Sequence, residues 1–548
     1  MIGNKSGIKL LPVSALYKVL PHAEPCRAER GSFLRGENYD FQIAYFSDRT
    51  IWNATVRARG EIARYLTVRE ELLAPVTFTP DGADDYYLEA GRCCIIPDAL
   101  AVPRTTGINV PSNQWRAVWI TLDVPDDYTA GNYQIEFEFV TAEGEVLAKT
   151  EFTVELVDAR LPETDLRLTN WIHYDCIAYQ HGVTLFSEDF YKVFGEYLNA
   201  YVKLGFNMLF TPLFTPPLDT EVGGERTTAQ LIGVKITKSG YAFDFSELEK
   251  FVCFAKAHGI EYFELSHLFT QWGGKATPKI MTNENGEEKR IFGWDIASDS
   301  TEYREFLSAF LPSLVQELKK IGVAENCILH LTDEPSEGDL ATYAKCYALV
   351  KEFAAELPIF DALSNYAFYE NGYVDMPAVL LNAVKNFSAH GKKDIFVYNC
   401  CLPADGYHSN RFINMPAERT RVLGIQLYAS GAKGYLHWGF NFHNSYLSKI
   451  PIDPYRETDG AGAYPCGDGF IVYPNGESIN LSLRAELIKA GFNDYRALKL
   501  LESKIGRPAV LDLLQDKGYK TFTNYPRNAD ALCELRETVN QTIKNFFE

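Results

Sequence analysis

Long apolar runs are absent from this sequence of 548 residues. No stretch of about 20 apolar residues occurs, so we expect no membrane-spanning helix. The segment 1–11 also lacks an apolar stretch long enough for a signal peptide. We therefore expect a cytoplasmic protein, although an extracellular location stays open if the native chain starts earlier.

Positive charge is scarce as well. Lysine and arginine together number 53, against 72 aspartate and glutamate residues, which gives a formal net charge of −19 at pH 7. Nucleic-acid binding needs a basic stripe that replaces phosphate counterions, and anionic membranes attract basic segments. The charge balance argues against both partners and leaves a small-molecule substrate open. The sequence does not predict the oligomeric state.

Several motifs of nucleotide, nucleophile and redox chemistry are missing. The chain has no GxxxxGK[ST] loop, no GxGxxG after an expected strand and no GxSxG elbow. Nucleotide chemistry and a serine nucleophile are therefore disfavoured, and we expect no cofactor. The eleven cysteines include no CxxC pair, which favours free thiols over disulfides or a redox motif.

Aromatic residues are abundant at 14% of the chain, with 35 Phe and 32 Tyr. Dense core packing explains such a content, and stacking platforms for the apolar faces of sugars are the functional alternative. Composition alone favours core packing.

The chain predicts a multidomain protein, because its length exceeds what a single core supports. Residues 1–162 carry short alternating strands and turn-rich connections, which indicate an N-terminal β-sandwich. The clearest of these strands cover residues 41–46, 115–122, 133–140 and 152–157.

Residues 163–480 alternate between strands and amphipathic helices, which predicts a (β/α)8 TIM barrel. The eight expected strands cover residues 168–174, 207–214, 262–267, 327–332, 359–363, 378–381, 395–400 and 434–438. The region 366–377 has weak helical periodicity and is the least regular part of the pattern. Residues 481–548 are amphipathic and helical, and we expect them to pack on the barrel.

Two adjacent carboxylates, Asp333 and Glu334, end the expected strand 327–332, and Pro335 prevents that strand from continuing. Parallel barrels carry their chemistry at the carboxyl ends of their strands. The alternative is structural, since acidic residues before Ser336 would also suit the N-terminus of a helix. Because the surrounding pattern predicts a barrel, the catalytic interpretation is favoured.

Other polar and aromatic side chains follow the remaining strands, where they would meet at the same rim. We expect substrate-binding residues among His173, Asp175, Arg226, His267, Gln271, Trp272, Tyr398, Trp438 and Asn441. Each has a structural alternative. The tryptophans can be core residues, Arg226 can anchor its loop through Asp219, and His267 and Gln271 can cap a turn.

Histidines at this rim raise the question of a metal ion. His173, His267 and His437 would face one another, with Asp175 as a fourth ligand. The zinc-binding barrel hydrolases usually carry an HxH pair on the first strand, and this chain lacks that pair. We therefore expect no metal.

Adjacent carboxylates do not suit ordinary retaining glycoside hydrolysis, in which an acid and a nucleophile stand on opposite sides of the bond, roughly 5–5.5 Å apart. They suit substrate-assisted hydrolysis, in which a 2-acetamido oxygen attacks the anomeric carbon. Glu334 would then be the acid/base, and Asp333 would orient the acetamido N–H. Tyr398 is the candidate for holding the carbonyl oxygen.

The chain resembles glycoside hydrolase family 123 and the related DUF4091-type proteins over most of residues 165–500. The resemblance rests on the segments TDEP (332–335), LHWGFN (436–441), GDGFIVYP (467–474) and SLRAELIKAGFNDY (482–495). It implies a β-sandwich before a catalytic barrel, and a retaining, exo-acting β-N-acetylgalactosaminidase that uses the substrate-assisted route. By this resemblance Asp333 and Glu334 carry over as the catalytic pair and Trp438 as a pocket wall, while the match around Tyr398 is looser.

Two other functions stay open. A glycosidase acting on a sugar without the acetamido group would need a protein nucleophile, for which Asp175 is the strand-end candidate. A carbohydrate-binding protein without catalytic activity is also compatible with the fold.

Overall fold

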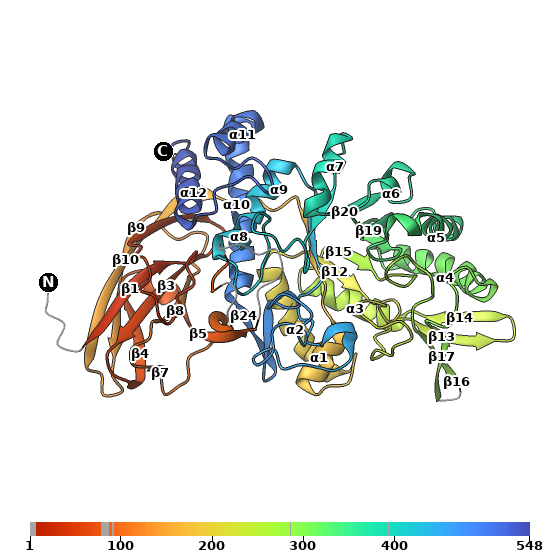
Figure 1. Ribbon diagram of the computed structural model, residues 1–548, viewed down its shortest axis with the longest axis horizontal. Helices are drawn as coiled ribbons and strands as arrows, with labels where there is room; N and C mark the ends of the chain where they lie inside the picture. The colour runs from red at the N-terminus through yellow and green to blue at the C-terminus, as the bar shows by residue number, and fades with distance from the viewer. Residues whose placement is uncertain (1–6, 78–86, 90–92, 285–286, 393, 548) are drawn as a thin grey trace.

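The computed structural model describes residues 7–77, 87–89, 93–284, 287–392 and 394–547. Residues 1–6, which belong to the segment considered for a signal peptide, lie outside this description. The N-terminal strands occupy one end of the molecule and the barrel occupies the other (Figure 1). In the described part of the chain, no helix combines the length and apolar character that crossing a membrane requires.

The N-terminal region contains two sheets that share one core. The first has the strand order β1-β3-β8-β5-β6-β24-β23 and the second the order β2-β10-β9-β4-β7. Phe41 from one sheet stacks on Phe152 from the other at 4.2 Å between ring centroids. The strands are β1 (Ile8–Ser14), β2 (Arg30–Arg35), β3 (Tyr39–Ser47), β4 (Ile51–Arg59), β5 (Leu66–Val76), β6 (Cys94–Ala101), β7 (Ile108–Val110), β8 (Arg116–Leu122), β9 (Gly131–Val140) and β10 (Val146–Arg160).

The four strands predicted in this region correspond to β3, β8, β9 and β10. The residues of β3 and β8 are buried almost continuously, whereas β10 alternates between buried and more exposed residues along most of its length. The β-rich character of the region is thus confirmed, and its assignment as a β-sandwich stays a prediction.

The chain returns to the N-terminal sheet after the barrel. Strands β23 (Val472–Asn475) and β24 (Ser478–Ser482) extend that sheet, and Leu481 pairs with Leu100. Two residues beyond β24, the fully buried Arg484 donates from Nε and Nη2 to the Asp98 carboxylate, both at 2.8 Å. The boundaries expected at 162 and 480 stay predictions.

Eight parallel strands form the second half of the protein, in the order β11-β22-β21-β20-β19-β18-β15-β12. All eight predicted strands are present, so the barrel prediction is confirmed. The strands are β11 (Arg167–Asn170), β12 (Met208–Thr211), β15 (Tyr262–Leu265), β18 (Cys327–His330), β19 (Ile359–Leu363), β20 (Met376–Leu380), β21 (Phe396–Tyr398) and β22 (Gly434–His437).

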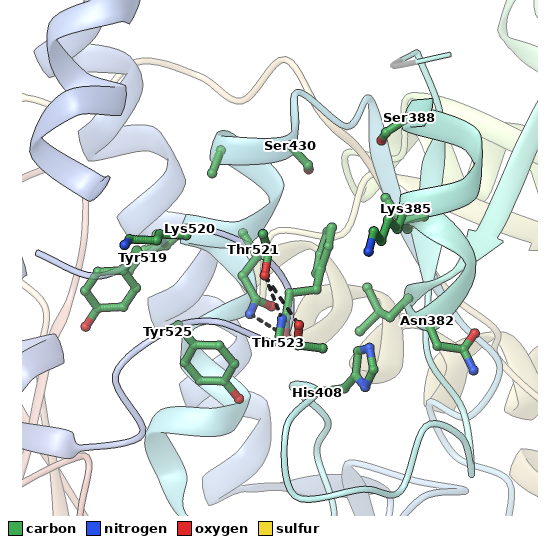
Figure 2. A pocket seen from close by; sticks show the side chains of 16 residues that line it. Asn382, Lys385, Ser388, His408, Ser430, Tyr519, Lys520, Thr521, Thr523 and Tyr525 are labelled. Atoms are coloured by element: carbon green, nitrogen blue, oxygen red, sulfur yellow. Dashed lines mark hydrogen bonds between the residues drawn. The ribbon is translucent and has the colours of Figure 1, made fainter. Parts of the chain in front are cut away.

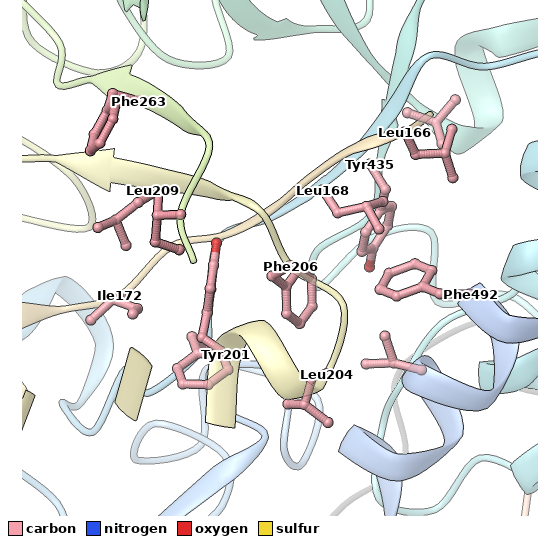
Figure 3. Packing of buried hydrophobic residues seen from close by; sticks show 14 of the residues in the cluster. Leu166, Leu168, Ile172, Tyr201, Leu204, Phe206, Leu209, Phe263, Tyr435 and Phe492 are labelled. Atoms are coloured by element: carbon pink, nitrogen blue, oxygen red, sulfur yellow. The ribbon is translucent and has the colours of Figure 1, made fainter. Parts of the chain in front are cut away.

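Side chains bridge the two ends of this nearly closed sheet, where β11 lies beside β12 (Figure 3). The hydroxyl of Tyr201, which is 0% exposed, accepts from the Asn170 amide at 2.9 Å and donates to the Met208 carbonyl at 2.6 Å. The Asn207 side chain accepts from the Leu168 amide at 2.9 Å. These bonds satisfy buried backbone groups at the seam, which would be costly to leave unpaired.

Helices cover the barrel and fill the C-terminal segment. Ser187 and Ser300 accept hydrogen bonds from the amides of Phe190 and Tyr303, and so cap the first turns of α2 and α4. The helices are α1 (Tyr174–His181), α2 (Glu188–Lys203), α3 (Ser246–Ala257), α4 (Thr301–Lys320), α5 (Leu340–Phe353), α6 (Ala367–Glu370), α7 (Val384–Ala389), α8 (Ala417–Arg421), α9 (Leu423–Ser430), α10 (Leu483–Ile505), α11 (Arg507–Asp516) and α12 (Ala529–Lys544). The only helix in the weakly periodic region 366–377 is the short α6.

Two hairpins project from the βα connections. They are β13 (Gly233–Thr237) with β14 (Gly240–Asp244), and β16 (Ile280–Glu284) with β17 (Glu287–Phe292). The helical character expected for residues 481–548 is confirmed. Helix α10 lies beside α9 of the barrel. Helix α12 lies beside β10 and β2, which belong to the second of the two N-terminal sheets.

Replacing Tyr201 with Phe tests the seam. The substitution keeps the ring but leaves the Asn170 amide and the Met208 carbonyl without their buried partner, so we expect a loss of about 1–3 kcal/mol in the free energy of unfolding. Urea unfolding followed by circular dichroism measures it. The matched control is Tyr179→Phe at a side chain that is 61% exposed, where the change should stay within about 0.5 kcal/mol. Equal midpoints for the two variants would contradict the bridging role.

Candidate active site

A cavity of about 260 Å³ opens at the carboxyl ends of the barrel strands. Asp333 and Glu334 line it shortly after β18, and Trp438 lines it directly after β22. This is the end at which parallel barrels carry their chemistry. The lining comprises Trp171, Leu218, Asp219, Gln271, Trp272, Asp333, Glu334, Ala362, Tyr398, Cys400, Cys401, Leu436, Trp438, Tyr446 and Tyr464.

The backbone of the Asp333–Glu334 pair is held from both sides. The Asp333 carbonyl accepts from the Trp272 amide at 2.8 Å, and the Glu334 amide donates to the Ala362 carbonyl at 3.1 Å. Glu334 and Trp272 both have positive φ angles, 44° and 58°. Such backbone conformations cost energy in residues other than glycine and persist where neighbouring structure fixes them.

The two carboxylates have different surroundings. Burial raises the pKa of Asp333 well above its ordinary value, and the nearby Glu334 raises it further. Glu334 is exposed to the cavity, and its Oε1 accepts from the Tyr398 hydroxyl at 2.7 Å. Burial, followed by the charge of Glu334, raises the pKa of Tyr398, so this hydroxyl stays protonated and available as a donor.

Another residue takes the helix-capping role that was the structural alternative for the pair. The Ser336 amide donates to the Asp339 carboxylate at 3.0 Å, and the Ser336 hydroxyl donates to the same oxygen at 2.5 Å. This capping box precedes α5. Asp333 and Glu334 are therefore not needed for the start of this helix.

The indole of Trp438 forms one wall and is fixed from behind. Its Nε1 donates to the buried Asp468 carboxylate at 3.0 Å, and its backbone carbonyl lies 2.8 Å from Nε2 of His173. Burial raises the pKa of Asp468 to about 7. The Tyr464 ring packs against the indole, with 5.2 Å between the ring centroids. A rigid aromatic face is what stacking on a sugar requires.

Four of the predicted binding residues lie behind this wall and do not line the cavity. Arg226 donates to both Asp175 oxygens, at 2.8 and 3.0 Å, and to the Leu218 carbonyl at 2.8 Å. The Asn441 side chain bonds both backbone groups of His173. All four are at least nine-tenths buried. Their polar atoms hold one another and the wall, and their expected contact with a substrate stays a prediction that this position does not favour.

The structural alternative for Arg226 was an anchor through Asp219, but Arg226 anchors its loop through Asp175 and the Leu218 carbonyl. Asp219 lines the cavity and instead joins three loops: its amide donates to Gln271 Oε1 at 2.6 Å, while its carboxylate accepts from the Leu447 amide at 3.0 Å and the Tyr464 hydroxyl at 2.5 Å. Gln271 is therefore at the cavity, as predicted, with its side-chain oxygen used by this loop. Trp272 is 42% exposed at the cavity mouth.

His267 is the fifth predicted residue that lies outside the lining. It is fully buried inside the barrel, where its ring stacks on His330 at 4.1 Å between centroids. Burial lowers its pKa well below the ordinary value, so it is neutral. The prediction of a rim position is corrected, because this side chain points into the barrel.

Sequence reasoning missed three aromatic residues of the lining. Trp171 directly follows β11, so the same strand-end rule would have identified it. Tyr446 and Tyr464 come from the long connection between β22 and β23, where no local pattern marks them. All eleven cysteines are free, as predicted.

One group of described residues has a geometry compatible with a metal ion, namely His267, His330 and Asp361, whose ligand atoms lie within 4.8 Å of one another. The donor set does not fit a metal well. Both nitrogens of His330 already face carboxylates, Glu264 and Asp361, and the His267 ring lies stacked on His330. The expectation that the protein holds no metal stays a prediction.

A larger cavity, of about 500 Å³, lies elsewhere, between α7, α9 and residues 519–525 (Figure 2). Lys385, His408 and Tyr525 are among its lining residues. This lining contains no carboxylate, so it offers no pair of carboxyl groups for hydrolysis.

One solved structure has the same overall architecture as this chain. A family 123 glycoside hydrolase from Clostridium perfringens, whose structure is described in terms of glycolipid glycan hydrolysis, superposes with a TM-score of 0.75 at 15% identity and covers 98% of this chain and 97% of its own. An endo-β-1,4-mannanase from Thermotoga petrophila has a TM-score of 0.35 at 14% identity, covering 61% of this chain and 77% of its own. No curated protein matches the sequence.

The family model described as "Glycoside hydrolase 123, catalytic domain" matches residues 171–501. This match spans more than half of the chain and includes every residue of the cavity lining. The chain therefore belongs to glycoside hydrolase family 123 and is a glycoside hydrolase.

Proposed function

We propose that this glycoside hydrolase is a retaining, exo-acting β-N-acetylhexosaminidase, and more specifically a β-N-acetylgalactosaminidase, that works by substrate-assisted catalysis. The observation that carries the proposal is the adjacent pair Asp333 and Glu334 on one wall of a small cavity, with the Tyr398 hydroxyl on Glu334. Neighbouring residues do not place an acid and a nucleophile on opposite faces of a sugar. An acetamido group supplied by the substrate acts as the nucleophile, so the protein does not need one of its own.

In the first step, the protonated Glu334 gives its proton to the glycosidic oxygen as the bond from that oxygen to the anomeric carbon breaks. The acetamido carbonyl oxygen forms a new bond to the anomeric carbon, which gives an oxazolinium ion. Asp333, as a carboxylate, accepts the acetamido N–H and stabilises the positive charge. Asp333 is half-buried, which strengthens this interaction because water screens such a charge less than an exposed one.

In the second step, the Glu334 carboxylate takes a proton from water, whose oxygen attacks the anomeric carbon from the face that the leaving group vacated. The bond to the acetamido oxygen breaks and the amide is restored. Two displacements at one carbon retain the β configuration. The acid and the base are therefore the same residue, as an exposed carboxyl group in reach of both leaving group and water permits.

The remaining cavity residues receive supporting roles. The cavity, at about 260 Å³, is smaller than the pockets of about 300–1,000 Å³ that drug-sized ligands fill, which suits one terminal sugar. Trp438 would stack on the sugar face. We infer that the acetamido carbonyl oxygen takes over the Tyr398 hydroxyl from Glu334 when the substrate binds, because this donor already points into the cavity.

The preference for galactosamine rests on family membership and on the resemblance of the catalytic motifs. The similar Clostridium perfringens enzyme is described as acting on glycolipid glycans. A β-linked terminal N-acetylgalactosamine is the substrate that this proposal carries over.

A glycosidase acting on a sugar without an acetamido group receives less support. Asp175, the nucleophile that such an enzyme would need, is bound by Arg226 and does not line the cavity. Asp219 does line it, but its two oxygens accept from Leu447 and Tyr464. These contacts therefore do not support a free carboxylate that could act as a nucleophile from the far side of the cavity.

Replacing Glu334 with Gln tests the acid/base role. We expect kcat/KM on aryl β-N-acetylgalactosaminide to fall about 10²–10⁴-fold, because proton transfer to the leaving oxygen is lost. The assay compares this substrate with the N-acetylglucosaminide and the plain galactoside, and uses the N-thiazoline of the preferred sugar as inhibitor. Glu337→Gln, an exposed carboxylate outside the lining, is the matched control. Cleavage of the plain galactoside alone would contradict the acetamido mechanism.

The pH dependence tests the role of Asp333. This residue must be ionised to accept the acetamido N–H, and its pKa is raised, so activity should fall as the pH drops through that raised pKa. We expect the acidic limb of kcat/KM to lie above about pH 4, where an ordinary aspartate titrates. Hydrolysis rates measured between about pH 3 and pH 9 locate the limb. A limb at or below the ordinary aspartate value would count against this role.

A further inference from the structure

Three ionisable side chains lie inside the barrel, beneath the cavity, on neighbouring strands. Glu264 on β15, His330 on β18 and Asp361 on β19 are each 0% exposed. His330 Nε2 contacts Glu264 Oε1, and His330 Nδ1 lies 3.3 Å from Asp361 Oδ1. Burial lowers the pKa of His330, but the two carboxylates outweigh it and raise the pKa to about 9. The ring is thus an imidazolium at neutral pH.

This buried chain is anchored at its far end on the first strand of the barrel. Glu264 Oε2 accepts from the Thr169 hydroxyl at 2.7 Å, and Oε1 accepts from Trp171 Nε1 at 2.8 Å. At the near end, Asp361 Oδ2 accepts from the Thr332 amide at 3.0 Å and from its hydroxyl at 3.3 Å. Thr332 directly precedes Asp333, so the chain ends on the backbone of the catalytic pair.

The other groups that pack around the His330 imidazolium are neutral or apolar, apart from the two carboxylates. His267 on the β15 side stacks on it and is neutral, while Trp171, Phe210 and Phe360 contribute apolar rings. Tyr343 faces Asp361 from α5, and burial raises the pKa of that hydroxyl, so it too is neutral. His330 lowers the pKa of Asp333, whereas Asp361 and Glu264 raise it.

We propose that Asp361 and His330 are positioning residues for the catalytic pair: Asp361 holds the Thr332 amide, and the imidazolium of His330 holds Asp361 and offsets the carboxylates beneath Asp333. This inference rests on the proposed function of Asp333 and Glu334. Its physical basis is that buried carboxylates on adjacent strands are tolerated only when they are paired and hydrogen-bonded. The pairing fixes the strand ends from which the catalytic pair projects.

Two substitutions in the chain should shift the pH profile in opposite directions. Asp361→Asn removes a negative charge near the catalytic pair, so both limbs of kcat/KM should move to lower pH. His330→Gln removes the positive charge, so both limbs should move to higher pH. We expect shifts of about one pH unit, and a fall in kcat of about 10²-fold with KM changed less, since small displacements of catalytic groups are costly.

The matched control is His443→Gln, at another buried histidine, whose Nε2 lies 3.1 Å from the Val472 carbonyl. This variant should lose stability but keep the position of the pH profile. A purely structural role for the chain would move the profiles of Asp361→Asn and His330→Gln in the same direction, or leave both in place. Either result would overturn the proposal. If His330→Gln does not fold, the shift of the isosteric Asp361→Asn decides alone.

Hydrogen exchange separates this proposal from the proposed function. In Asp361→Ala the Thr332 amide loses its acceptor, so its exchange should speed up at least tenfold, while the Glu334 amide keeps the Ala362 carbonyl. Unchanged exchange at Thr332 would overturn the positioning role whatever the activity. The opposite outcome is also distinguishable. If the wild-type enzyme turns over no acetamido sugar, and the Thr332 amide of Asp361→Ala still exchanges faster than in the wild type, the proposed function is rejected and the positioning role is retained.

Discussion

The closure of the parallel barrel is the constraint on which the rest of this structure depends. The carboxyl ends of eight strands meet at one mouth only if the first and second strands of the barrel are joined. Here Tyr201 and Asn207 make that junction with side-chain hydrogen bonds to the buried backbone of β11 and β12. Trp171 and Trp438 follow β11 and β22, which pair directly, so the cavity walls inherit their positions from this ring.

Behind the cavity, the protein uses paired buried charges as its framework. Arg226 with Asp175 supports the wall that carries Trp438, and Arg484 with Asp98 ties the first turn of α10 to the N-terminal sheet. Each pair is expensive to remove from water and is therefore matched in charge and hydrogen bonding. Such pairs fix geometry more than they add net stability. The proposed catalytic carboxylates differ, because Asp333 and Glu334 line the cavity and no salt bridge to either is found among the described residues.

This arrangement connects the fold to the proposed chemistry. Burial raises the pKa of Asp333, and the charge of the neighbouring Glu334 raises it further. The proposed mechanism uses the pair with a single proton. A pair with one proton holds both a donor for the leaving oxygen and an acceptor for the acetamido N–H. The buried His330 is the last residue of β18, three residues before Asp333. In the proposed arrangement its positive charge partly offsets the negative charge of the neighbouring carboxylates. Family membership and geometry thus lead to the same class of reaction.

The sequence determined the order of strands and helices, the acidic pair and the aromatic residues Trp272 and Trp438 at strand ends, because periodicity and chain breaks are local properties. It did not determine which strand-end side chains enter the cavity. His173, Asp175, Arg226, His267 and Asn441 lie in the connections that follow strands, as Gln271 does, yet they are buried and do not line the cavity. Whether a side chain at a strand end points into the barrel core, into the cavity wall or into the cavity depends on packing between segments that are distant in the sequence. Tyr446 and Tyr464 reach the site through tertiary contacts, since Asp219 accepts hydrogen bonds from Leu447 and Tyr464 of the connection that carries both tyrosines.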